Sequence, residues 1–360
     1  MTGYPEIIVY CMIPVISGFQ HSAGRHCGST SLRDISNFGG WPLSEAAVFG
    51  LASGLASYFI ESPGIFMGRC RNLEVNYLKA FRLPYVIRQY KTFRELHDFI
   101  DSKMKNGQPV MLQGDVHGLS YYNSPVHFPG HKFVICGKDA DTFYAADTNF
   151  AEYQAVSLKA LEKTTAYEDN IWPGIFTAFD IELPLPALDA ARGLQSLKTS
   201  FSVQLKELAQ PDDPVFKGGH TGLQLWAQSL NVDIWKDANF KIISRFVYQV
   251  IEKRGTGGGA FRGLYKDFLT EIIEDTIFPF SIHSSIEAGS DKLLNLLVEL
   301  RALTEAEFGL LRQIAMKYKM LSIEKIALNP AKQEIQTLLN TFEKTEFQMI
   351  QCLNSIVDIF

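Results

Sequence analysis

The sequence predicts an α+β protein. Its first domain, residues 1–185, combines N-terminal helices with an antiparallel sheet, and its second domain, residues 186–360, is α-helical. Between residues 107 and 146, apolar residues come in short runs separated by turn-forming residues, a pattern typical of strands. Beyond residue 187 they recur at three- and four-residue steps, which is typical of helices. At 360 residues, the chain is long enough for two such domains.

The N-terminal part is predicted to lead into a short helix that carries a cysteine. Residues 7–16 are rich in Ile and Val and predict a buried strand or an extended segment. Cys27 is followed by small residues and then by apolar residues at three-residue steps, until Gly39 and Gly40 stop the pattern. This arrangement predicts a helix with Cys27 in its first turn.

Two further helices are predicted before the strands begin. Ser44 is suited to capping a helix, and the mostly apolar run 46–60 that follows predicts a buried helix. Thr92 and Glu95 have the spacing of a capping box and predict an amphipathic helix over residues 92–105.

The sheet of the first domain is predicted from three strands, residues 109–113, 131–136 and 143–146. Turn-forming residues at 137–142 join the last two strands into a hairpin. If Gly137 lies opposite Thr142, the start of the first hairpin strand faces residue 147 or 148.

In the second domain, the segment Thr304–Glu307 has the pattern of a capping box, and Pro330 is expected to open another long helix. The glycine-rich stretch Arg254–Arg262 interrupts the helical pattern. Two interpretations stay open for it, a phosphate-binding loop and a mobile or tightly packed loop. No Lys-Ser/Thr follows the glycines, and this favours the second.

Composition narrows the classes of function. The net charge of −5 argues against broad nucleic-acid binding, which depends on clustered Lys and Arg. The five cysteines, an odd number, favour a reducing compartment over a disulfide framework. The first basic residue is Arg25, so the apolar start lacks the basic region of a signal peptide, and the run 46–60 is too short to span a bilayer. We therefore expect a cytoplasmic protein without a membrane segment.

Cys27 is a candidate nucleophile. The unpaired N–H groups and the positive dipole end of a helix stabilise a thiolate over a thiol, so a cysteine in the first turn gains reactivity. A buried structural cysteine is the alternative interpretation. His26, next to it, either tunes the thiol or faces solvent, and Glu45 is expected to cap its own helix.

A histidine and an aspartate are expected to lie side by side at the open end of the hairpin. His131 begins one strand and Asp147 follows the next, within the reach of cross-strand neighbours. With Cys27 they predict a Cys-His-Asp arrangement, in which the histidine takes the thiol proton and the aspartate orients it. The alternatives are that Asp147 caps a turn, or that a metal binds to a set drawn from Asp115, His117, His127, His131 and Asp147.

An ordered series of motifs resembles the N-terminal domain of butirosin biosynthesis protein H. The segment around Arg254–Leu269 resembles the helical domain that commonly follows it. The motifs are His26-Cys27-Gly28-Ser29-Thr30, Leu43-Ser44-Glu45-Ala46-Ala47, Gly107-Gln108-Pro109-Val110, Gly130-His131-Lys132-Phe133 and Ala146-Asp147-Thr148.

This resemblance implies a papain-like cysteine peptidase-type fold for the first domain. It also implies an acyltransferase that moves an acyl group from a carrier-protein thioester to an amine in natural-product biosynthesis. By position, Cys27 is the nucleophile, His131 the base and Asp147 the orienting acid. Gln20 is expected to contribute to the oxyanion hole, and Asp115 to bind the acceptor amine or serve as a structural residue. The phosphopantetheine belongs to the acyl carrier protein, so no cofactor or metal of the chain's own is expected.

Two other functions stay open at this point. In a cysteine peptidase or amidase, water would resolve the same acyl-enzyme, and nothing in the sequence decides between water and an amine. A non-catalytic structural or carrier-binding protein would keep Cys27 and His131 far apart. The sequence does not identify the acyl group, the acceptor or the oligomeric state, and a homo-oligomer stays open.

Overall fold

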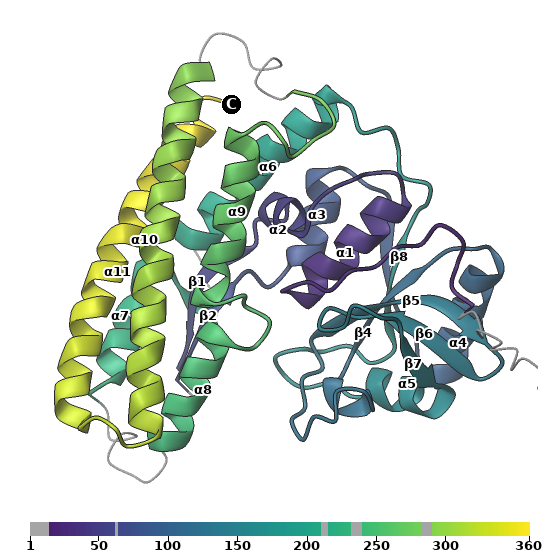
Figure 1. Cartoon of the computed structure of the whole chain (residues 1–360), viewed down its shortest axis with the longest axis horizontal. Coiled ribbons are helices and arrows are strands. Elements are labelled where there is room, and N and C mark those ends of the chain that lie inside the picture. The colour runs from purple at the N-terminus through teal and green to yellow at the C-terminus, as the bar shows by residue number, and fades with distance from the viewer. Residues whose placement is uncertain (1–13, 62–63, 210–214, 232–239, 282–289) are drawn as a thin grey trace, which may run out of the picture. The chain divides into compact units, whose positions relative to one another are not determined.

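A computed structural model describes residues 14–61, 64–209, 215–231, 240–281 and 290–360 (Figure 1). Most of the segment predicted at 7–16 lies outside these residues. Over this part of the chain the protein is a mixed α+β structure with antiparallel sheets and C-terminal helices. The described residues divide into two compact units, the first formed by those up to residue 23 with those in 85–183, and the second by those in 24–84 with those in 184–360. Because the units interleave along the chain, the linear domain boundary near residue 185 stays a prediction.

The first unit is built on a six-stranded sheet in the order β3-β8-β4-β5-β6-β7, in which every neighbouring pair is antiparallel. The three strands predicted from sequence, β4, β5 and β6, lie side by side within it (Figure 1). The strand bounds are β3 Tyr85–Gln89, β4 Val110–Gly114, β5 His131–Asp139, β6 Thr142–Ala146, β7 Gln154–Ser157 and β8 Thr177–Ile181.

The hairpin turn is tighter than predicted. Only Ala140 and Asp141 separate β5 from β6, and Ala140 adopts a left-handed conformation with φ of 46°. Gly137 therefore pairs with Tyr144 and not with Thr142, so the predicted register was wrong. An irregularity between Ile135 and Gly137 then shifts the register once more.

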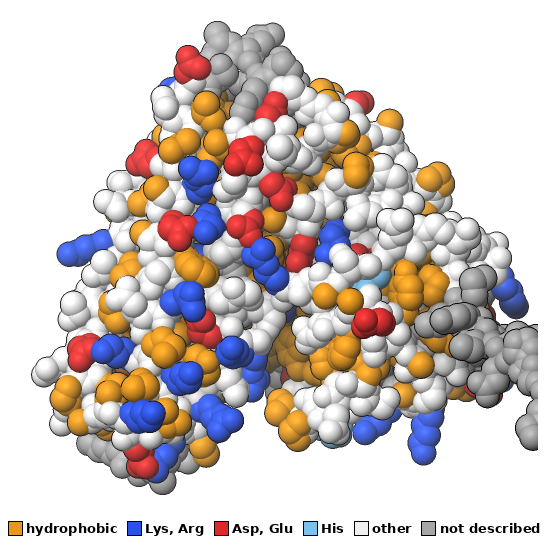
Figure 2. All heavy atoms as spheres, viewed as in Figure 1, with side chains coloured by type: hydrophobic (Ala, Val, Ile, Leu, Met, Phe, Trp, Pro, Cys, Tyr) orange, Lys and Arg blue, Asp and Glu red, His pale blue; other side chains and the backbone are white. Residues whose placement is uncertain are grey.

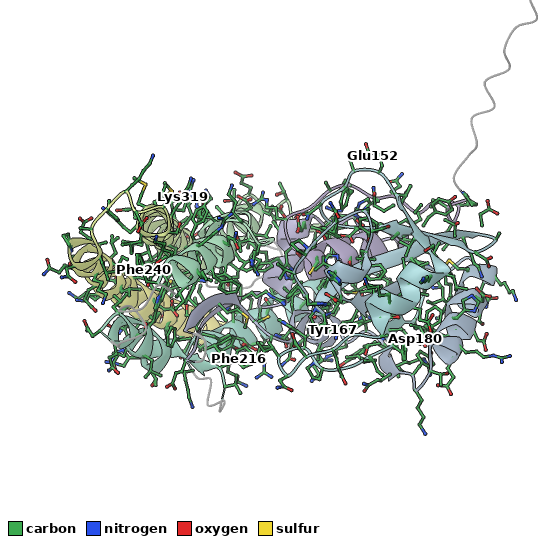
Figure 3. All side chains as sticks on the ribbon, turned by 90° about the horizontal axis from the view of Figure 1, so that it is seen from below. Glu152, Tyr167, Asp180, Phe216, Phe240 and Lys319 are labelled. Atoms are coloured by element: carbon green, nitrogen blue, oxygen red, sulfur yellow. The ribbon has the colours of Figure 1, made fainter. Side chains whose placement is uncertain are left out.

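Helices α4 (Phe93–Lys105) and α5 (Leu158–Thr165) cover apolar side chains of this sheet. The capping box of Thr92 and Glu95 at the start of α4 is confirmed. At the other end of α4, Lys103 forms an ion pair of 2.7 Å with Asp180 on β8, which is labelled in Figure 3. The shared core includes Leu96, Ile100, Leu112, Phe133, Phe143 and Leu161.

The second unit begins with helices α1 (Cys27–Phe38), α2 (Glu45–Leu51) and α3 (Leu73–Ala80), and with strands β1 (Leu55–Ile60) and β2 (Ile65–Arg69). The Ser44 hydroxyl caps α2 by accepting the N–H of Ala47, as predicted. The helix predicted over 46–60 is wrong in its second half. There Ser53 turns left-handed with φ of 55°, and the aromatic and β-branched residues that follow form β1.

In the described residues from 184 onward, the regular structure of the second unit is helical apart from β9 (Lys217–Gly218), which pairs with β1. The long helices α10 and α11 run side by side (Figure 1). The capping box predicted at residue 304 is wrong, because α10 begins well before it and the Thr304 hydroxyl donates back to the Leu300 carbonyl. The helices are α6 Ala190–Ala209, α7 Gly219–Ser229, α8 Phe240–Glu252, α9 Arg262–Ile273, α10 Ser290–Ser322 and α11 Leu328–Val357, with the 3-10 turn η3 Gly259–Phe261 before α9.

Figure 2 shows basic and acidic side chains interspersed over the helices of the second unit, with no continuous area of one sign on the face in view. In the described residues, no helix has both the length and the apolar character needed to cross a bilayer.

A buried charged cluster joins the parts of the second unit. The Arg262 side chain at the start of α9 is completely buried and donates to Glu307 at 2.9 Å and to Glu346 at 3.4 Å. It also donates to the carbonyls of Ala56 and Gly68 on β1 and β2. One guanidinium thus connects two strands with α10 and α11, and it faces two buried carboxylates.

This cluster predicts a pH-dependent stability. Burial raises the pKa of Glu307, Arg262 lowers it in part and Glu346 raises it again, to about 8 in the folded protein from an ordinary 4.5. The folded state therefore holds a proton that the unfolded state has lost, so stability falls as pH rises from about 4.5 to about 8. The slope of one proton is at most ~1.4 kcal/mol per pH unit.

The Glu307→Gln variant, which cannot ionise, is expected to flatten this dependence. Urea unfolding of both proteins at several pH values between 5 and 8 measures the difference. Equal slopes in the two proteins would mean that Glu307 is ionised throughout the range.

Candidate active site

Cys27 is the first residue of α1, which confirms the helix predicted for this segment. His26 immediately before it caps the helix, because its Nδ1 atom accepts the Ser29 backbone N–H at 3.2 Å. The His26 ring is 3% exposed, so the solvent-facing alternative was wrong. An imidazole nitrogen that accepts an N–H carries no proton, so this cap requires the neutral tautomer with its proton on Nε2.

Glu45, the first residue of α2, organises the chain just before the cysteine. Its carboxylate accepts the backbone N–H groups of Arg25 and His26 at 2.8–2.9 Å. It also accepts the hydroxyls of Ser29 and Thr30 at 3.1 and 3.0 Å. Glu45 lies in the first turn of its own helix, as expected, and it also fixes the entry into α1.

His131 and Asp147 lie side by side in the first unit. The His131 Nε2 atom is 2.9 and 3.0 Å from the two carboxylate oxygens of Asp147, and both side chains are buried. His131 is the first residue of β5, and Asp147 directly follows β6. A carboxylate at Nε2 holds the proton on that nitrogen, so Nδ1 is the atom with which His131 can accept a further proton.

Two tyrosines that the sequence did not single out complete the surroundings of Asp147. The hydroxyl groups of Tyr121 and Tyr122 each donate to one Asp147 oxygen at 2.7 Å. Tyr122 also packs edge-on against the His131 ring, with 5.3 Å between ring centroids. The Tyr-Tyr pair lies in an irregular segment after β4, where no periodic pattern marks a residue's neighbours, so its role was not predictable.

These contacts make Asp147 a stable anion. Burial alone would raise the pKa of its carboxyl group, but the His131 charge and hydrogen bonds from His131, Tyr121 and Tyr122 together lower it below its ordinary value. Burial and the Asp147 charge raise the pKa of Tyr121 well above its ordinary value. The Tyr121 hydroxyl therefore stays protonated and continues to donate its hydrogen bond to Asp147. The arrangement can therefore orient an imidazole and stabilise an imidazolium.

Asp115 holds the loop that carries the tyrosines. Its buried carboxylate accepts the backbone N–H of Phe128 at 2.6 Å and of His117 at 3.2 Å, and it pairs with the His127 ring at 2.5 Å. These partners all belong to its own loop, which supports the structural alternative, whereas its contact with an acceptor stays a prediction. Gln20 is exposed, and its oxyanion role also stays a prediction.

The metal alternative named Asp115, His117, His127, His131 and Asp147. Among the residues that the structure describes, no three His, Cys, Asp or Glu side chains group closely enough to hold a metal ion.

The described residues thus form an α+β protein. One unit carries a histidine that is oriented by a buried aspartate, and the other carries a cysteine at the start of a helix. Residues 26–148 match the family model described as butirosin biosynthesis protein H, N-terminal. Residues 179–277 match a domain of unknown function, DUF4872. The chain thus contains a segment similar to the N-terminal domain of butirosin biosynthesis protein H, followed by a segment similar to DUF4872. No curated protein matches the sequence significantly.

Proposed function

We propose that the protein is a biosynthetic enzyme, an acyltransferase that carries an acyl group from a carrier-protein thioester through Cys27 to an amine and forms an amide. The family match supports a role in natural-product biosynthesis. The observation that carries the chemistry is the buried His131–Asp147 pair with its two tyrosine donors, because such an imidazole is suited to moving protons. A papain-like arrangement of the catalytic residues is part of the proposal.

In the first half-reaction, His131 takes the Cys27 proton and the thiolate attacks the thioester carbonyl. The developing oxyanion is stabilised by the Cys27 backbone N–H and by Gln20 as second donor. When the tetrahedral intermediate collapses, the pantetheine sulfur leaves and takes the proton from His131. Because one thioester replaces another, this step is close to balanced in energy and depends mainly on positioning.

In the second half-reaction, the acceptor amine attacks the acyl-Cys27 carbonyl while His131 Nδ1 takes the amine proton. Collapse of this intermediate forms the amide and releases the Cys27 thiolate. Asp147 stays ionised throughout and stabilises the imidazolium that forms twice in the cycle.

The covalent intermediate tests the proposal. Wild-type protein and the Cys27→Ala variant are incubated with a panel of acyl N-acetylcysteamine thioesters and examined by intact-mass spectrometry. We expect an acyl adduct on Cys27 in the wild type and none in the variant, and the Cys352→Ala variant, which lacks a buried cysteine of α11, serves as a matched control. An adduct that persists in Cys27→Ala would refute the nucleophile.

Adding amines or only water to the isolated acyl-enzyme then separates the two enzyme classes. Amide formation that outpaces hydrolysis supports the acyltransferase. Release of free acid alone, whatever the amine, would assign the protein to the peptidase and amidase class.

The two tyrosines predict a smaller and separable effect. Tyr121→Phe and Tyr122→Phe each remove one donor to a charged carboxylate, a bond worth about 1.5–3 kcal/mol. We expect kcat to fall roughly tenfold in each variant with little change in KM, since the loss concerns the orientation of His131. Steady-state kinetics measure this, with Tyr153→Phe as control because its hydroxyl donates to the Phe19 carbonyl and not to Asp147. A tenfold loss of kcat in Tyr153→Phe as well would show that the loss does not come from the hydrogen bonds to Asp147.

A further inference from the structure

The glycine-rich stretch between α8 and α9 belongs to the DUF4872 match and packs against the residues that precede Cys27. Gly255 and Gly257 both have positive φ, and a Cβ atom on Gly257 would lie 2.8 Å from the Arg25 side chain. A side chain at either position would be strained in conformation, and at Gly257 it would also collide with Arg25. The loop is therefore tightly packed. The sequence favoured a mobile or tightly packed loop over a phosphate-binding loop, without separating the first two.

The loop ends on an aromatic residue that contacts the cap of the cysteine helix. Ala260 and Phe261 are both left-handed, with φ of 48° and 72°, a conformation that residues with a side chain adopt only where the surroundings enforce it. This conformation directs the buried Phe261 ring edge-on to His26, with 5.3 Å between ring centroids. Phe49 of α2 stacks on Phe261 and also contacts His26 edge-on. His26 is thus held between two aromatic rings while its Nδ1 caps α1.

Two acidic residues of helix α9 hold the chain segments beside this contact. Asp267 forms an ion pair of 2.7 Å with Arg25, and Glu271 accepts the hydroxyl of Ser44, the cap of α2. Charged groups around the start of α1 are the Arg25–Asp267 pair, Glu45 of α2 and Glu74 of α3, which lies against Gly28.

We propose that the DUF4872 domain acts as a positioning element for Cys27, in which Phe261 fixes the His26 ring and His26 in turn fixes the first turn of α1. The proposal rests on the function of Cys27 as nucleophile. A capped first turn keeps its N–H groups aligned, and these aligned groups favour the thiolate and stabilise the oxyanion. His26 acts through its cap and moves no proton of the substrate.

Two substitutions at the cap test this with a readout that does not require turnover. The rate at which iodoacetamide alkylates Cys27 is measured across pH by peptide mass spectrometry, since alkylation consumes the thiolate. We expect His26→Ala to lower the rate at neutral pH roughly tenfold, the equivalent of one lost helix cap, and His26→Asn to restore it because asparagine is a good cap. The His26→Ala profile is expected to shift toward higher pH.

A third substitution tests the part played by the DUF4872 domain. Phe261→Leu is expected to slow alkylation several-fold and to lower kcat more than it raises KM. Phe201→Leu is the matched control, because Phe201 is equally buried in the same unit but packs on Phe268 and Phe360. Thermal melting of all variants shows how far each is destabilised.

Wild-type alkylation profiles in His26→Ala and Phe261→Leu, or an equal change in Phe201→Leu, would overturn the positioning role. If the proposed function fails instead, the Cys27→Ala variant keeps its activity. The alkylation profile of Cys27 would still differ between the wild type and His26→Ala. The two failures are therefore distinguishable.

Discussion

The His131→Ala variant is expected to lose at least about 10^4-fold in kcat, the size of effect seen when the base of a nucleophile–imidazole–carboxylate unit is removed. The imidazole serves both half-reactions, so neither acylation of Cys27 nor attack by the amine retains its proton acceptor. KM for the carrier thioester is expected to change little, because the lost interaction is made in the transition state. Steady-state and single-turnover kinetics with a carrier-bound donor measure both effects.

His220→Ala is the control for this experiment. His220 is a histidine on α7 whose side chain is 69% exposed and pairs with Glu343, so its removal should leave kcat within about twofold. Residual activity in His131→Ala close to that of the control would show that another group accepts the proton.

The Arg262→Met variant is expected to lose about 3–5 kcal/mol of unfolding free energy, the cost of leaving buried charge without its partner. Glu307 and Glu346 are both buried beside the guanidinium, and Arg262 also satisfies carbonyls of β1 and β2. Methionine fills similar volume but donates no hydrogen bond. Urea unfolding at pH 7 measures the loss, and the loss should shrink at pH 5, where Glu346, whose pKa burial raises, can be protonated as Glu307 already is.

Neutralising the partners should recover most of this stability. The triple variant Arg262→Met, Glu307→Gln, Glu346→Gln removes the charges together, and buried ion clusters replaced as a whole are often close to neutral in stability. Arg312→Met is the surface control, since Arg312 is 57% exposed and pairs with Glu252 at 3.5 Å, and it should cost below about 1 kcal/mol. If the triple variant is as unstable as Arg262→Met, the loss of unfolding free energy comes from altered packing and not from unpaired charge.

The sequence predicted helix starts that are set by the residues next to them. The start of α1 at Cys27, the Ser44 cap and the Thr92 capping box are set by neighbouring residues and could be predicted. The run 46–60 was misassigned because continuous apolar sequence fits a buried helix and a buried strand equally well. Only the left-handed turn at Ser53, a three-dimensional feature, divides it into α2 and β1.

In the candidate site, the pairing of His131 with Asp147 was predicted from hairpin proximity, although the register that led to it was wrong. The two side chains still meet because both are long enough to span a difference of one or two residues in the strand register. Tyr121 and Tyr122 were not predictable, since an irregular loop brings them to Asp147. The contact of Phe261 with His26 joins residues more than two hundred positions apart and depends wholly on tertiary packing.

The proposed mechanism requires that the Cys27 sulfur come within reach of the His131 imidazole. The short bifunctional reagent 1,3-dibromoacetone, which alkylates a reactive thiol first and then a nucleophilic nitrogen within its reach, measures this directly when the digested protein is sequenced by mass spectrometry. We expect one cross-linked pair of peptides, joined through Cys27 and His131, that is absent from Cys27→Ala and from His131→Ala. Modification of Cys27 with no link to His131, or a link to another residue in its place, would contradict it.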